Sequence, residues 1–108
     1  MYHESYSGRE PLRHALGDSE IRIRFYAARE LQKLGDHAGT PVLVEAAGND
    51  EAFPLDRVEA VQLLGLSGDA RAVEPLKRIG GARISFQYPH SNLNLQQECD
   101  LALKQLGH

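Results

Sequence analysis

The sequence has a single cysteine, Cys99, among its 108 residues, and it has no tryptophan. One cysteine excludes an internal disulfide and a metal site built from several thiolates. Aromatic residues make up only 6% of the chain, whereas leucine and alanine are frequent. Because aromatic and β-branched residues favour strands while Leu and Ala favour helices, this balance indicates an α-helical protein.

Long hydrophobic runs and an excess of one charge are also missing. No stretch approaches the about 18 apolar residues of a membrane-spanning helix, and residues 1–10 lack the features of a signal peptide. We therefore expect no membrane contact and a cytoplasmic location. The net charge of -3 disfavours nucleic acid as the partner, because phosphate binding usually requires a basic excess.

The most informative feature present is an internal repeat. Shifting the chain by 33 residues against itself superposes identical residues, and the ending Leu-x-x-Leu-Gly of the first unit occurs again at residues 103–107. The identical pairs are Arg24 and Arg57, Ala27 and Ala60, Leu31 and Leu64, Gly35 and Gly68, Asp36 and Asp69, and Leu43 and Leu76. A period of this length is typical of stacked helical repeats.

Each unit contains a long and a short helical segment. The long segments are predicted at about residues 20–34, 54–67 and 93–106, and they carry apolar stripes at helical spacing, Ile23, Ala27, Leu31, Leu34 and Leu55, Val58, Val61, Leu64. The short segments, about residues 10–17, 40–48 and 74–80, have proline in the first turn and glycine near the end. Asp36 and Asp69 follow Gly35 and Gly68 as expected N-caps.

These segments predict an all-α fold: a short α-solenoid of about six helices in antiparallel pairs. We expect residues 1–108 to form one domain, with a flexible N-terminus at residues 1–8 and an inserted loop at residues 81–92. The loop is inferred from spacing, since Gly107 lies 39 residues after Gly68 instead of 33. Insertions in such folds map to loops on one face.

The pattern resembles the HEAT-like repeat first associated with phycobiliprotein lyase subunits, over about residues 11–107. The resemblance is carried by Ile23-Arg24, Ala27-Ala28, Leu31, Leu34-Gly35-Asp36 and Thr40-Pro41-Val42-Leu43-Val44. It implies a HEAT-like α-α superhelix and leaves the activity open, since scaffolds and chromophore-lyase subunits share the repeat. The third unit departs from the pattern, with Gln96 where Arg24 and Arg57 stand.

Two groups of residues are candidates for binding. The first, in the inserted segment, comprises Phe86, Tyr88 and His90, although Ile84 and Phe86 could instead cover the gap between units, or the segment could be a short strand. The second lies on the short helices, which line the concave side of a HEAT solenoid, and comprises Arg13, His14, Glu45, Lys77 and Arg78. Ordinary solvated charges would give the same pattern. For Arg24 and Arg57 we expect a structural role, bonding loop carbonyls or Asp36 and Asp69.

The sequence offers no catalytic constellation. The five histidines lack the spacing of metal ligands, no phosphate-binding loop is present, and Cys99 replaces the alanine of the other two units, which predicts a small buried side chain. We therefore expect no metal, no cofactor and no enzymatic activity, and a module for protein–protein interaction or scaffolding. The alternatives are an accessory subunit of a phycobilin-type chromophore lyase and a weak nucleic-acid binder.

The partner is expected to be a protein whose identity the sequence does not give. Counted in units of a long and then a short helix, the first and the last helices are unpaired. This register predicts self-association, in its simplest form a homodimer through the C-terminal helix. The leucines of that helix are Leu93, Leu95, Leu101, Leu103 and Leu106.

Overall fold

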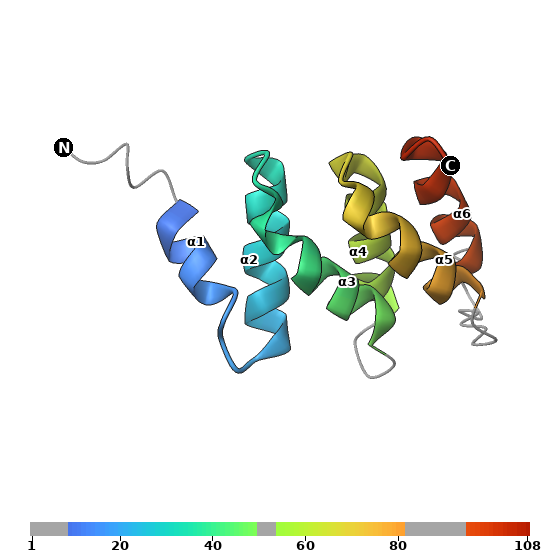
Figure 1. Cartoon of the computed structure of the whole chain (residues 1–108). Helices are drawn as coiled ribbons and strands as arrows, with labels where there is room; N and C mark the ends of the chain where they lie inside the picture. Colours follow the sequence, from blue (N-terminus) through green and yellow to red (C-terminus); the bar gives the residue numbers. More distant parts are fainter. Residues whose placement is uncertain (1–8, 50–53, 82–94) are drawn as a thin grey trace.

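The computed structural model describes residues 9–49, 54–81 and 95–108, and within these ranges the chain forms six α-helices and no strand (Figure 1). The prediction of an all-helical chain is confirmed for this part. The helices are α1 (Arg9–Ala15), α2 (Ile21–Lys33), α3 (Thr40–Gly48), α4 (Pro54–Ser67), α5 (Val73–Gly81) and α6 (Leu95–Gln105), and short 3-10 turns η2 (His37–Gly39) and η3 (Ala70–Ala72) precede α3 and α5. The predicted N-terminus at 1–8 and, apart from Gly81, the inserted loop lie outside the described residues.

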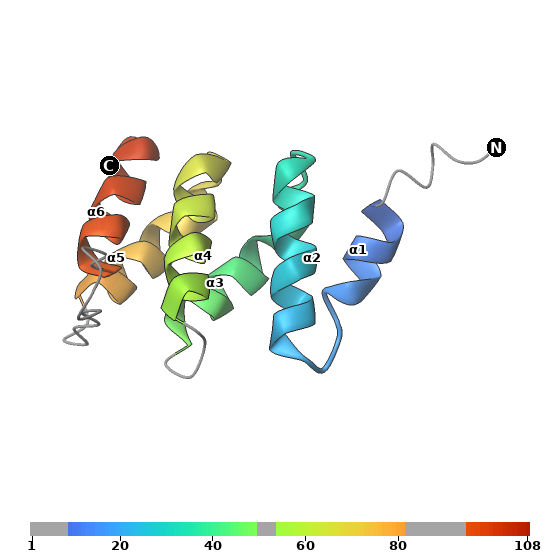
Figure 2. The same cartoon turned by 180° about the vertical axis from the view of Figure 1, so that it is seen from behind.

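The long helices α2, α4 and α6 stand side by side in a row, and α3 and α5 lie on one side of it (Figures 1 and 2). The molecule is elongated, with extents of 49 × 29 × 21 Å. Each short helix packs chiefly on the long helix that follows it: α1 on α2, α3 on α4, and α5 on α6. The expectation that the first and last helices are unpaired is therefore wrong, because the close pairs are offset from the sequence repeat.

The long helices end in the same way. Gly35, Gly68 and Gly107 have φ of 76°, 71° and 89°, a left-handed conformation that glycine adopts without strain. After α2, the amide of Asp36 donates to the carbonyl of Leu31 at 2.9 Å, and after α6 the amide of His108 donates to Leu103 at 2.8 Å. Glycine thus fixes the point at which the chain reverses.

Ser67 explains how the second turn departs from the repeat. Its hydroxyl donates to the carbonyl of Leu64 at 2.6 Å and accepts from the amide of Asp69 at 3.0 Å, so it bridges two groups that the other turns join directly. The predicted caps are present: Asp36 accepts from the amide of Ala38, and Asp69 from that of Arg71, both at 2.9 Å. Each cap begins a 3-10 turn that leads into the next short helix.

The core follows the repeat. Leu31, Leu43, Leu64 and Leu76 are fully buried, one on each of four consecutive helices. The predicted stripes are wrong at their ends: Ile23, Leu34 and Leu55 are exposed, whereas Phe25 and Ala28 are buried. The reason is that α2 also packs against α3 and α4, so its buried face extends round the helix toward them.

Two glycines allow α6 to approach its neighbours. A Cβ on Gly65 of α4 would lie 2.7 Å from the Cα of Ala102, and one on Gly80 of α5 would lie 2.9 Å from the Cβ of Cys99. Cys99, which the sequence predicted to be small and buried, thus meets a glycine where α5 and α6 cross. Within the described ranges, no helix combines the length and apolarity that crossing a bilayer requires.

Candidate binding surface

The predicted binding residues of the short helices are exposed, but three of them are already engaged within the chain. Arg13 on α1 donates to Asp36 from both Nη2, at 2.7 Å, and Nε, at 3.0 Å. The pKa of Asp36 is lowered, first by the hydrogen bond from the amide of Ala38 and then by Arg13. Arg13 therefore ties α1 to the turn after α2.

Glu45 on α3 has a similar structural contact. Arg24 donates two hydrogen bonds to the Glu45 carboxylate, one from Nη2 at 2.6 Å and one from Nε at 3.3 Å. The same guanidinium donates to the carbonyls of Asp18 and Ser19 at 2.8 and 3.2 Å. This confirms the expected structural role of Arg24, which holds the loop before α2 against α3.

Arg57 also has the structural role that the sequence predicted. It is almost fully buried, and its Nε donates to the carbonyl of Ala47 in α3 at 3.0 Å. The carboxylates of Asp36 and Asp69 are bound by the side chains of Arg13 and Arg71. The repeated arginines thus fasten the first turns of α2 and α4, at the ends of these helices that lie away from the Gly-Asp turns.

Lys77, Arg78 and His14 differ in how far they are engaged. Lys77 lies 3.8 Å from Glu74, one turn earlier on α5, and both side chains are largely exposed, so the contact is weak. Arg78 and His14 are exposed, and neither forms a hydrogen bond or ion pair within the described part of the chain. Among the five predicted residues, the positive charges without a close carboxylate are therefore those of Lys77 and Arg78, both on α5. Phe86, Tyr88 and His90 fall outside the described residues.

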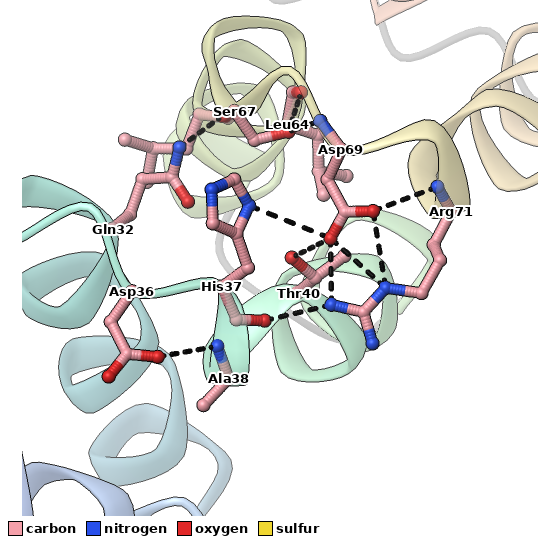
Figure 3. A network of polar contacts seen from close by, with 10 residues as sticks. Gln32, Asp36, His37, Ala38, Thr40, Leu64, Ser67, Asp69 and Arg71 are labelled. Atoms are coloured by element: carbon pink, nitrogen blue, oxygen red, sulfur yellow. Dashed lines mark hydrogen bonds and ion pairs between the residues drawn. The ribbon is translucent and has the colours of Figure 1, made fainter.

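A polar cluster that the sequence did not predict joins the two Gly-Asp turns (Figure 3). Asp69 accepts hydrogen bonds from Arg71 Nη2 at 2.7 Å and from the Thr40 hydroxyl at 2.9 Å, and the imidazole of His37 lies 3.7 Å away. Arg71 also donates to the carbonyl of His37 at 3.0 Å. The side chain of Gln32 reaches across as well, donating to the carbonyl of Leu63 at 3.3 Å.

The cluster is a structural connection, because its carboxylate has little capacity left for a ligand. The pKa of Asp69 is held well below its ordinary value, mainly by the side-chain hydrogen bond from Arg71 and further by the Arg71 amide and Thr40. Only the repeated Gly-Asp dipeptide signalled this contact in the sequence. Arg71 and Thr40 have no counterpart of the same type in the other units.

Cys99 is fully buried, as predicted from its place in the repeat. Burial first, and then the neighbouring carboxylate of Asp100, raises the pKa of its thiol to about 11. The thiol is therefore protonated near neutral pH, which is unfavourable for a nucleophile. Within the described ranges, no three acidic, histidine or cysteine side chains are grouped as metal ligands.

Exposed apolar side chains also occur on the long helices, of which only the C-terminal one was predicted to be an interface. The large ones are Ile23, Tyr26, Leu34, Leu55, Leu66 and Leu101, all within α2, α4 and α6 or at the C-cap of α2. Among the leucines of α6, Leu95 is buried, and Leu103 and Leu106 pack against the core. Leu101 is exposed, and Leu93 lies outside the described residues.

Comparison with protein-family models and with curated protein sequences gives no match.

Proposed function

We propose that this chain is a HEAT-like helical-repeat module, a short α-solenoid of antiparallel helix pairs, that binds another protein and performs no catalysis itself. The repeated Gly-Asp turns, the row of long helices and the buried Arg57 at the position of Arg24 support the repeat. Stacked repeats offer broad preformed surfaces, which bind partners without large ordering costs.

The binding site that we propose lies on α5, at Lys77 and Arg78. The observation that carries it is the exposed guanidinium of Arg78, which has no partner within the described residues, beside a lysine held by only one distant carboxylate. Arg13 and Glu45 do not belong to this site, because Arg13 lies on α1 at the opposite end of the row and Glu45 is bound by Arg24 (Figure 1). A partner segment rich in Asp or Glu fits this surface, because guanidinium groups pair with carboxylates in a two-pronged geometry.

The experiment uses a fluorescent oligo-glutamate peptide as the probe and the Lys77→Glu, Arg78→Glu double variant. We expect the double variant to bind at least about tenfold more weakly, a loss of roughly 1.4 kcal/mol. The matched control is Lys104→Glu, a charge reversal at an exposed residue of α6. Equal binding by all three proteins would refute the site on α5.

Two other ligands are tested in the same series. A tetrapyrrole that gains a new visible absorption band on mixing would support a chromophore-lyase subunit instead. Labelled DNA or RNA that is retained with a steep dependence on salt would support a nucleic-acid binder. Our proposal predicts neither effect, and it predicts that the double variant loses the partner recovered by the wild-type chain from its native extract.

A further inference from the structure

The three long helices present a continuous outward-facing set of side chains. Counting back from the glycine that ends each helix, residues at 13, 9, 6 and 2 positions before it share one side, because steps of four, three and four follow the helical period. We call this set the outer row. Its members are Arg22, Tyr26, Arg29 and Lys33 on α2; Leu55, Glu59, Gln62 and Leu66 on α4; and Glu98, Leu101 and Gln105 on α6, and none of these is buried.

The outer row lies on the side of the molecule away from α3 and α5, where Figure 2 shows α2, α4 and α6 in front. Neighbouring helices are joined along it. Arg29 on α2 contacts Glu59 on α4 at 3.3 Å, and Gln62 on α4 donates to Glu98 on α6 at 3.1 Å. The row is therefore a preformed surface whose helices are held in register.

The composition of the outer row changes from one end to the other. Its α2 segment carries three cations and a tyrosine, and Arg29 lies over the Tyr26 ring at 5.5 Å. Its α4 segment carries two leucines that are 65% and 68% exposed, and its α6 segment carries a carboxylate and Leu101, 52% exposed. Exposed leucines on one face of adjacent helices supply apolar area that a partner can bury.

We propose that the outer row is the docking surface for a second copy of this chain, in a symmetric dimer whose twofold axis runs parallel to α4. In this arrangement α4 lies parallel to the α4 of the second copy, and α2 faces the second copy's α6. The basic end of each copy then faces the end that carries Glu98, and Leu66 meets Leu66.

The charges select this axis over the alternative. A twofold axis perpendicular to α4, within the plane of the interface, would place α2 over the α2 of the second copy. Arg22, Arg29 and Lys33 would then face the same three cations. One carboxylate, Glu30, is shared by Arg29 and Lys33 at 3.6 and 3.2 Å, so the α2 segment keeps a positive excess, and like charges brought together at an interface weaken binding. In a closed twofold arrangement the outer row of each copy is covered by the other copy. No third copy can then bind there, so the assembly stops at two copies.

The first test measures self-association by sedimentation over a concentration series. We expect a concentration-dependent dimer, and we expect Leu66→Glu to raise its dissociation constant at least about tenfold, because two carboxylates would be buried at the axis. The matched control is Ile23→Glu, an exposed apolar position outside the outer row that should leave the constant unchanged. Circular dichroism verifies that both variants are folded.

The second test determines the orientation with introduced cysteines and oxidised glutathione. Leu66→Cys should form a covalent dimer with itself, whereas Leu55→Cys mixed with Leu66→Cys should give no cross-linked heterodimer. The natural Cys99 does not compete, since it is fully buried. A strict monomer up to about 1 mM, a dimer indifferent to Leu66→Glu, or a specific 55–66 cross-link would each overturn the proposal. None of these outcomes depends on the binding site at Lys77 and Arg78.

Discussion

Asp36 and Asp69 connect neighbouring helices of the repeat. Asp36 and Asp69 each cap a 3-10 turn through one carboxylate oxygen and bind an arginine side chain through the other or both. Charge-assisted hydrogen bonds of this kind are stronger than neutral ones, and both side chains are largely shielded from solvent. The folded chain consequently favours the ionised form of each aspartate.

The first prediction concerns acid stability. Because the pKa of Asp69 is lower in the folded chain than its ordinary 3.8, its contribution is complete above about pH 4 and is lost as the pH falls further. We expect Asp69→Asn to lower the free energy of unfolding by about 1–3 kcal/mol at pH 7 and to flatten its decline in acid. Urea unfolding between pH 7 and pH 2 measures both effects. If the free energies of unfolding of the two proteins decline equally as the pH falls, the ionised Asp69 does not stabilise the fold in this way.

The second prediction compares two leucines that lie two residues apart. Leu64 is fully buried and Leu66 is mostly exposed. Leu64→Ala should destabilise the chain by about 2–5 kcal/mol because it opens a cavity in the core, whereas Leu66→Ala should change stability by less than about 0.5 kcal/mol. Urea unfolding of dilute protein measures both. A neutral Leu64→Ala would mean that the core is assigned incorrectly.

At the scale of helices, the boundaries were largely predictable. The predicted segments 40–48 and 54–67 coincide with α3 and α4, because proline in the first turn and a terminal glycine mark helix ends through local sterics. The 3-10 turns before α3 and α5 were not predicted as separate elements. They arise from the aspartate caps, which shape the chain before the apolar spacing of the next helix begins.

The surface was less predictable, because exposure and pairing depend on neighbours that are distant in sequence. Glu45 looked available for a partner, but it binds Arg24, which lies 21 residues away. Likewise, Ile23 has the spacing of a core residue, yet it lies at the margin of the face that α2 buries. The sequence gives the period of an apolar stripe, whereas the arrangement of neighbouring helices decides where that stripe is covered.

The third prediction uses the same substitution at two glycines in helices. Gly65→Ala should destabilise the chain by about 1–3 kcal/mol despite alanine's better helix propensity, because its methyl group would meet the backbone of Ala102. Gly81→Ala has open space around it and should be neutral or stabilising by up to about 1 kcal/mol. Thermal unfolding compares the two. If both changes shift the free energy of unfolding in the same direction, the close approach of α4 and α6 does not exclude a methyl group at position 65.

At the scale of the molecule, α6 differs from α2 and α4 on its free side. Ten and seven positions before the terminal glycine, α2 has Phe25 and Ala28 and α4 has Val58 and Val61, all buried. The corresponding residues of α6 are Gln97 and Asp100, both exposed. A polar face of this kind disfavours the packing of a further helix against α6.

The fourth prediction follows from that difference. Gln97→Val combined with Asp100→Val should give this side of α6 the apolar character of α4 and cause self-association through α6. The changes are made in the Leu66→Glu background, so that contact through the outer row does not contribute. Light scattering should then show species larger than those of the Leu66→Glu protein alone. An unchanged particle size would mean that these two side chains do not keep the face soluble.

The two kinds of connection between helices differ in how regular their lengths are. Along one edge, the Gly-Asp turns at residues 35–39 and 68–72 have equal length and are fixed by caps and by the contacts between Asp69, Thr40 and Arg71 (Figures 1 and 3). Between each short helix and the long helix that follows it, by contrast, the sequence has separations of unequal length, residues 16–20, 49–53 and 82–94. The Gly-Asp turns therefore set the spacing of α2 and α4 independently of the length of chain that separates α5 from α6.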